Sequence, residues 1–172
     1  MRPGTRHLVL VGLMGVGKTT VGRRLADELG WTWRDSDLDI TAATGRTVRE
    51  LRDEEGVDAM HAREAEQLLA ALADPGPNVV SAAASVADVD ACLLALLRPD
   101  VATVWLRADP AILATRFDSD VHRPAYGDRP ADFLAEQAAR RDPTFEALGG
   151  LVIDVDGLDP DRIVRRILAG LG

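Results

Sequence analysis

A glycine-rich segment, residues 12–19, constrains the fold of this chain more than any other feature. Its sequence, GLMGVGKT, matches the pattern G-x-x-x-x-G-K-[ST] in full. The segment follows His7–Gly12 (HLVLVG), a continuous apolar run typical of a central strand covered on both faces. It precedes Lys18–Leu29, in which apolar residues recur every four positions as on one face of a helix. The pattern therefore predicts a strand, a tight turn and a helix in immediate succession.

The residue types in this turn fit the chemistry of phosphate binding. Glycines let successive backbone N–H groups point inward, and the helix that follows adds the positive end of its dipole. Lys18 would follow the β- and γ-phosphates, and the Thr19 hydroxyl would face Mg²⁺. A turn that only caps a helix would not need a lysine, and Lys18 is the only lysine of the chain. We therefore expect ATP and Mg²⁺ as cofactors, with these nucleotide-binding residues: Gly12, Gly15, Val16, Gly17, Lys18, Thr19 and Thr20.

Strand-like and helix-like segments alternate along the whole chain, which favours one α/β domain (residues 1–172) with a parallel sheet. The strand candidates are His7–Gly12, Trp31–Arg34, Asn78–Ser81, Val101–Leu106 and Leu151–Val155. The helix candidates are Lys18–Leu29, Leu38–Ala43, Val48–Glu55, Val57–Ala73, Val86–Leu97, Pro110–Phe117, Ala131–Leu148 and Asp159–Leu171. Residues 118–130 show no periodicity and are expected to form a loop.

Composition and charge exclude several classes of protein. A formal net charge of −8 would repel nucleic acid from the average surface, so no nucleic-acid partner is expected. No apolar run approaches the roughly 20 residues of a membrane span, and we expect neither a membrane partner nor a signal peptide. The single cysteine, Cys92, cannot form an internal disulfide, which fits a reducing cytoplasm. We expect a cytoplasmic monomer.

Beyond the glycine-rich turn, the chain resembles the shikimate kinase family of P-loop kinases. The resemblance depends on GLMGVGKTTVGRRLADELGW, RDSDLDI, TGRTVRELRDEEG, HRP and ARRDPTF, in the same order and with similar spacing. It implies a three-layer fold with a five-stranded parallel sheet flanked by helices. It also implies an acceptor-binding segment at about 35–65 and a lid at about 118–130. The implied activity is transfer of the γ-phosphate of ATP to a hydroxyl of a small molecule.

The resemblance also implies roles for two aspartates near the end of the second predicted strand. Asp35 would support Mg²⁺ together with Thr19, and Asp37 would orient the attacking hydroxyl. Two carboxylates beside a triphosphate are tolerable only with a cation between them. In the alternative interpretation, Asp37 only caps the helix that follows.

Further roles are implied for residues in the second half of the chain. Arg123, in HRP, matches the lid arginine that reaches the phosphates on closure, and Arg129 is a second candidate. An ordinary surface loop with solvated arginines is the alternative. Arg116 matches a position against the adenine base, and Pro160 falls in the corresponding adenine loop.

The acceptor site departs from the family pattern at two places. The family holds the shikimate carboxylate with two arginines and a triple-glycine turn. Arg141 fits one arginine, whereas the other falls on His61, which cannot form a bidentate guanidinium fork. The triple glycine falls on Ala83-Ala84-Ser85, whose Cβ atoms would obstruct close approach of the backbone to the substrate. Loss of one fork would cost about 1.5–3 kcal/mol of binding.

These observations leave the acceptor open. The candidate substrate-binding residues are Asp37, His61, Ala84, Ser85 and Arg141, and the candidate catalytic residues are Lys18, Asp37 and Arg123. Shikimate is the leading acceptor by resemblance, and another polyol or hydroxy acid, such as gluconate or a cyclitol, is the alternative. A non-catalytic ATP-binding protein, and an NTPase or nucleotide kinase, are the rival functions.

Overall fold

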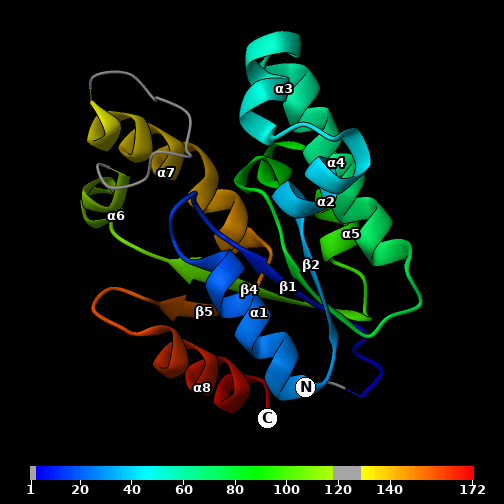
Figure 1. The fold of residues 1–172 in the computed structure, drawn as a ribbon. Helices are drawn as coiled ribbons and strands as arrows, with labels where there is room; N and C mark the ends of the chain where they lie inside the picture. Colours follow the sequence, from blue (N-terminus) through cyan, green and yellow to red (C-terminus); the bar gives the residue numbers. More distant parts are fainter. Residues whose placement is uncertain (1–2, 118–128) are drawn as a thin grey trace.

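Five parallel strands form one sheet in the order β2-β3-β1-β4-β5 (Figure 1). The computed structural model describes residues 3–117 and 129–172. The strands are β1 (His7–Val11), β2 (Thr32–Asp35), β3 (Asn78–Ser81), β4 (Val101–Arg107) and β5 (Leu151–Asp154). The parallel sheet confirms the predicted α/β class and the predicted number of strands.

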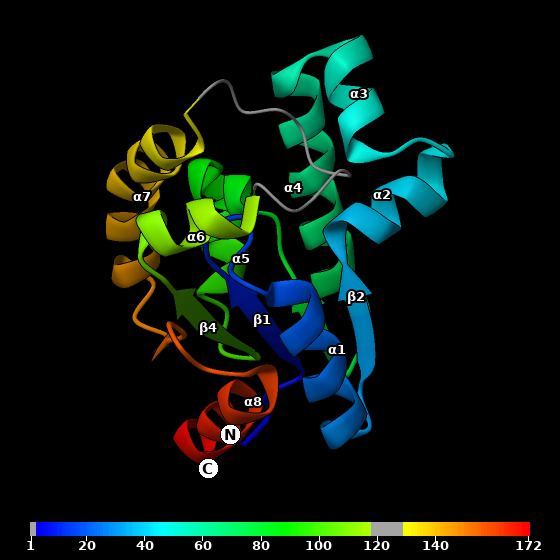
Figure 2. The ribbon, with the colours of Figure 1, turned by 60° about the vertical axis from the view of Figure 1, so that its left-hand side comes forward.

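Helices cover both faces of the sheet (Figures 1 and 2). The helices are α1 (Lys18–Leu29), α2 (Ser36–Thr44), α3 (Val48–Glu55), α4 (Val57–Ala73), the 3₁₀-helix η1 (Ala84–Asp88), α5 (Asp90–Leu96), α6 (Pro110–Phe117), α7 (Pro130–Ala147) and α8 (Pro160–Leu171). Among the described residues, no helix is both long and apolar enough to cross a membrane.

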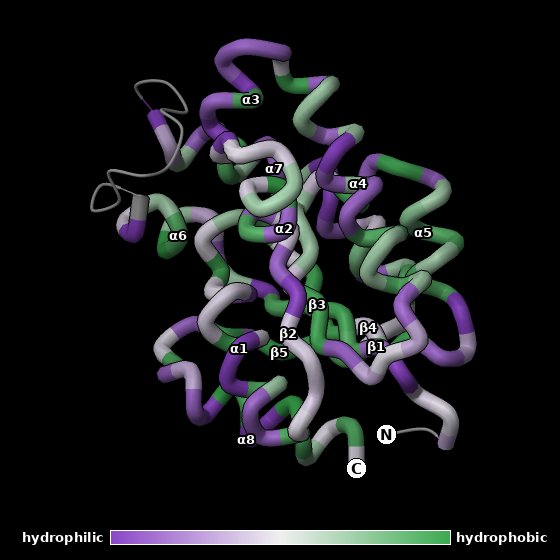
Figure 3. The backbone as a smooth tube through the Cα atoms, turned by 45° about the vertical axis from the view of Figure 1, so that its right-hand side comes forward, coloured by the Kyte–Doolittle hydropathy of each residue, from purple (hydrophilic) through white to green (hydrophobic). Residues whose placement is uncertain are grey.

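The central strand β1 supplies both halves of the hydrophobic core. Its five residues are all buried, and they alternate between the two faces. Leu8 and Leu10 belong to the cluster with α1 and α8, whereas Val9 and Val11 belong to the cluster with α4 and α5. Figure 3 shows that the central strands are hydrophobic. The continuous apolar run of β1 follows from this burial on both faces.

Several element bounds differ from the sequence prediction by one residue, and three differences bear on the rest of the structure. Strand β2 begins and ends one residue later than predicted, so that Asp35 is its last residue. Helix α2 begins at Ser36 rather than Leu38, and Asp37 therefore lies in its first turn rather than between the strand and the helix. The predicted helix Val86–Leu97 is two elements, η1 and α5, because Val89 between them has an extended backbone (φ −123°, ψ 110°). Apolar periodicity runs through this break and cannot reveal it.

A close contact between α1 and β3 fixes the helix that follows the glycine-rich turn. Gly22 of α1 faces Ser81, and a Cβ atom at position 22 would lie against the Ser81 hydroxyl. That hydroxyl donates to the carbonyl of Lys18 (3.0 Å) and accepts from Trp33 Nε1 (3.1 Å). Ser81 thus connects the first turn of α1 to both β3 and β2.

We predict that Gly22→Ala destabilises the protein although alanine is the better helix former. Helix propensity favours alanine by about 1 kcal/mol, whereas overpacking against Ser81 costs about 1–3 kcal/mol. A lower thermal unfolding temperature is expected, with partial recovery in Gly22→Ala/Ser81→Ala. Arg23→Ala, on the exposed face of the same helix, is the control. An unfolding temperature at or above that of the wild type would contradict the close packing.

Candidate active site

The glycine-rich turn connects β1 to α1 at the carboxyl edge of the sheet, where parallel α/β sheets bind their ligands. Gly12 has φ +135°, and a Cβ atom there would lie against the carbonyl oxygen of Leu106 in β4. Gly15 and Gly17 also have positive φ angles, 82° and 102°. The backbone can adopt this path only with glycine at these positions.

Lys18 and Thr19 begin α1 directly after the turn. The Lys18 ammonium donates to the carbonyl oxygens of Gly12 (2.8 Å) and Leu13 (2.9 Å), so its charge lies over the turn. The Thr19 hydroxyl donates to Asp35 Oδ2 (2.9 Å). This bond joins the start of α1 to the end of β2.

Asp35 is buried and caps α2. Its Oδ1 accepts from the backbone N–H groups of Asp37 (3.2 Å) and Leu38 (3.4 Å), while Oδ2 faces Thr19. The N-cap of α2 is thus Asp35, and the interpretation in which Asp37 caps this helix is wrong.

The pair of Thr19 and Asp35 fits the requirements of Mg²⁺. Nucleotide-bound Mg²⁺ needs only one or two protein oxygens, because phosphates and water supply its other ligands. Thr19 Oγ1 and Asp35 Oδ2 already lie together beside the turn. The described residues contain no cluster of three or more His, Cys, Asp or Glu side chains that would form a complete protein cage.

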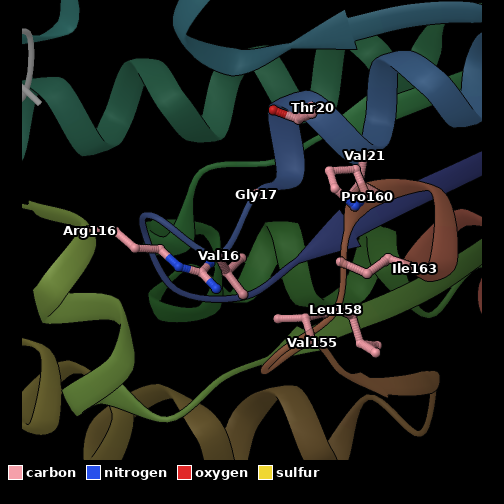
Figure 4. Close-up of a pocket in the computed structure, with 9 residues that line it drawn as sticks. All are labelled: Val16, Gly17, Thr20, Val21, Arg116, Val155, Leu158, Pro160 and Ile163. Carbon is pink, nitrogen blue, oxygen red and sulfur yellow. The ribbon is translucent and has the colours of Figure 1, made fainter. Parts of the chain in front are cut away.

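Figure 4 shows a pocket beside the turn that brings together residues far apart in the sequence. Arg116 of α6 and Pro160 at the start of α8 lie on opposite sides of it, and the Arg116 guanidinium reaches toward the carbonyl of Gly15 (3.5 Å). Most of the residues that line it have apolar side chains: Val16, Gly17, Thr20, Val21, Arg116, Val155, Leu158, Pro160 and Ile163. A slot with apolar side chains and one guanidinium suits a flat heteroaromatic base.

The other side of the site is formed by α2, α4, η1 and α7. His61 of α4 is half-buried, and burial, followed by the positive charge of Arg141, lowers its pKa. Glu64, one turn further along α4, is buried and accepts a hydrogen bond from the Ser85 hydroxyl. Burial raises the pKa of Glu64 to about 7, against the opposing effect of the Ser85 hydrogen bond, and the charge of Asp37 raises it further. His61, Glu64, Ser85 and Arg141 therefore share one region with Asp37.

The segment that replaces the expected triple glycine has an ordinary backbone. Ala83 has φ −62° and ψ 152°, and Ala84 and Ser85 begin η1. The Ala83 N–H donates to the Ser36 hydroxyl (3.3 Å), which connects this segment to the start of α2. The described residues include no non-glycine residue with positive φ, so these side chains cause no backbone strain here.

Arg141 is buried and already has a carboxylate partner. Its Nε (3.1 Å) and Nη2 (2.7 Å) both donate to Asp88 Oδ2, at the end of η1. Arg140 Nη2 lies 2.8 Å from the same oxygen. Although burial opposes it, hydrogen bonding to Arg141 lowers the pKa of Asp88.

The remaining candidate arginines lie elsewhere. Arg123 and most of the predicted lid fall outside the described residues. Arg129, the residue before α7, is exposed and pairs with Asp132 (2.9 Å) in the first turn of that helix. Arg63 donates to Glu55 (2.8 Å) at the end of α3, and so does not replace the missing guanidinium.

Sequence reasoning missed several residues of this region. Asp88 was absent from the candidates because an acidic residue between two apolar stretches carries no signal of its partner. Val155 and Leu158 line the pocket, but in the sequence they are indistinguishable from core residues. Only the topology, which places the loop after β5 beside the glycine-rich turn, identifies them.

Comparisons with known proteins agree with this geometry. The family model described as shikimate kinase matches residues 14–171. A shikimate kinase of Caulobacter vibrioides (strain NA1000 / CB15N) is 41% identical over 141 residues, 81% of this chain and 70% of the relative. A shikimate kinase of Paramagnetospirillum magneticum is 36% identical over 168 residues, 96% of this chain and 84% of the relative. A solved shikimate kinase from Acinetobacter baumannii in complex with shikimate is similar with TM-score 0.90 and 26% identity, covering 97% of this chain and 93% of that chain.

We predict that Glu64 makes stability fall as pH rises from about 5 to 8. Its folded-state pKa of about 7 exceeds the ordinary value of 4.5, so the folded state holds a proton that the unfolded state has lost. The free energy of unfolding therefore decreases across this window, by about 3 kcal/mol for this residue. Glu64→Gln should remove this decrease in urea unfolding at pH 5 and pH 8, and Glu66→Gln, exposed on the same helix, should not. Parallel pH profiles for the wild type and Glu64→Gln would contradict the prediction.

Proposed function

The chain belongs to the shikimate kinase family and is an ATP-dependent kinase, and we propose that Asp37 orients the hydroxyl of a small shikimate-like polyol for attack on the γ-phosphate. One observation carries this proposal. The Thr19–Asp35 hydrogen bond holds the glycine-rich turn against the start of α2, where Asp37 is the second residue. The groups proposed to bind the phosphates and to orient the acceptor therefore lie at one edge of the sheet.

The turn supplies the nucleotide half of the reaction. Its N–H groups and the N-terminus of α1 would hold the phosphates, and Lys18 would move from the Gly12 and Leu13 carbonyls to the transferring phosphoryl group. Mg²⁺, when bound, would neutralise charge on the β- and γ-phosphate oxygens, and Thr19 and Asp35 would hold it. The pocket with Arg116 and Pro160 would take the base.

The acceptor half depends on Asp37. A carboxylate in the first turn of α2 would accept a hydrogen bond from the attacking hydroxyl and receive its proton as the new O–P bond forms. Arg123 is proposed to complete the charge around the phosphoryl group when the lid closes. The expected monomeric state and cytoplasmic location stay predictions.

We predict that Lys18→Ala lowers ATP affinity and turnover together. The ammonium would stabilise the bound nucleotide in the ground state and the phosphoryl group in the transition state. We therefore expect kcat/KM for ATP to fall about 100-fold or more. A coupled assay of ADP release with Mg²⁺, ATP and an acceptor measures this change. Arg23→Ala, exposed on the same helix, is the control. Wild-type turnover in Lys18→Ala would contradict the proposal that the glycine-rich turn binds the phosphates of ATP.

We also predict that Asp37→Asn separates acceptor chemistry from nucleotide binding. Acceptor-stimulated ADP release should fall about 100-fold or more, because the amide cannot receive the proton. Binding of a fluorescent ATP analogue should persist, since Asp37 orients only the acceptor. Asp53→Asn, exposed on α3, is the matched control. If no acceptor stimulates the wild type and Asp37→Asn changes nothing, a non-catalytic ATP-binding function replaces this proposal.

A further inference from the structure

The acceptor side of the site has its own balance of charge. Five elements contribute ionisable groups to it: Lys18 from α1, Asp37 from α2, Asp58, His61 and Glu64 from α4, Asp88 from η1, and Arg140 and Arg141 from α7. Arg141 is the one buried cation in this set. An anionic acceptor would need a positive charge here that no carboxylate of the protein already compensates.

Asp88, a carboxylate of the same chain, already compensates the positive charge of Arg141. Two nitrogens of the Arg141 guanidinium, at 2.7 and 3.1 Å, share Asp88 Oδ2, and the Asp88 side chain is 20% exposed although the residue as a whole is exposed. A charge-assisted hydrogen bond in such partly dry surroundings is stronger than one formed in water. A carboxylate of the acceptor would have to compete with Asp88 for Arg141.

The second guanidinium at this carboxylate, Arg140, offers little help to an anion. It also binds Asp88 Oδ2 (2.8 Å), and its side chain is 58% exposed. Water and salt screen an exposed charge of this kind. The attraction of Arg140 for an acceptor in the site is therefore weak.

The α4 residues that face Arg141 add no positive charge. His61 is half-buried beside Arg141, and burial in such surroundings favours the neutral imidazole. Glu64 is buried and hydrogen-bonded to Ser85, so that ionisation would place a negative charge near Asp37. Both side chains suit hydroxyl groups, since the imidazole and the carboxyl group each donate and accept hydrogen bonds.

We propose that Asp88 makes this acceptor site select an uncharged polyol over a polyol carboxylate. By resemblance, Arg141 is the guanidinium that would bind an acceptor carboxylate; Asp88 already pairs with it, and His61 does not replace it. This inference rests on the proposed kinase function and specifies the class of acceptor. It makes Asp88 a specificity-determining residue that acts through Arg141.

The test compares two acceptors that differ by one charge. Shikimate carries a carboxylate, whereas its methyl ester keeps the ring and the hydroxyls without the charge. The coupled ADP-release assay should give the wild type a kcat/KM about tenfold or more higher for the ester. Equal values, or a preference for shikimate, would overturn the inference.

Two variants reverse the balance of charge by different routes. Asp88→Asn frees the Arg141 guanidinium, and His61→Arg adds a second one without removing the pair. Each should move the ratio of kcat/KM values toward shikimate by about tenfold. Asp90→Asn makes the same chemical change two residues away, at an exposed position of α5, and should leave the ratio unchanged. Because Asp88→Asn leaves Arg141 buried without this partner, thermal unfolding confirms that the variant is folded, and His61→Arg tests the inference independently.

A binding measurement distinguishes the two proposals. Isothermal titration of shikimate and of the methyl ester, with a non-hydrolysable ATP analogue present, reports acceptor selection without turnover. Tighter binding of the ester with no ADP release from either acceptor would contradict the proposed kinase chemistry and support the inference. ADP release with no preference for the ester would support the kinase chemistry and contradict the inference. Equal affinity and equal turnover for the two acceptors would overturn the inference.

Discussion

The close approach of the turn after β1 to the carbonyl oxygen of Leu106 in β4 is the constraint on which the site depends. A Cβ atom at Gly12 would collide with that oxygen, and the positive φ of this residue excludes most side chains as well. This contact holds the turn at the carboxyl edge of the sheet, directly before α1. The Ser81 hydroxyl then fastens the first turn of α1 to β3. The phosphate-binding half of the site is thus built mainly from backbone.

This backbone origin explains why most of the fold and the conformation of the glycine-rich turn could be predicted. A glycine that must lie against another strand, and a lysine that begins a helix, leave local patterns in the sequence. The alternation of buried strands and amphipathic helices likewise predicts a parallel sheet, which the structure confirms. The boundaries of α2 and α5 were wrong because they depend on the Asp35 cap and on the extended backbone at Val89, which apolar periodicity does not report.

The acceptor half could not be predicted to the same extent, because it consists of side-chain pairs between distant elements. Asp88 and Arg141 are 53 residues apart, and Glu64 and Ser85 are 21 residues apart. Neither pair has a characteristic spacing, since η1, α4 and α7 meet only in the folded chain. The resemblance implied an acceptor-binding role for Arg141, which stays a prediction, but it could not show that a carboxylate of the same chain already binds this arginine.

The two halves therefore tolerate sequence change differently. A substitution in the turn must keep glycine conformations and the contact with Leu106, so few changes are compatible with phosphate binding. On the acceptor side, one carboxylate can compensate one guanidinium through side chains alone, as the ion pair of Asp88 with Arg141 illustrates. The ordinary backbone angles of residues 83–85 show that even the segment facing the acceptor carries side chains without strain. A common phosphoryl-transfer frame can thus change its acceptor through the charge of a few side chains, and the inferred role of the Asp88–Arg141 pair illustrates such a change.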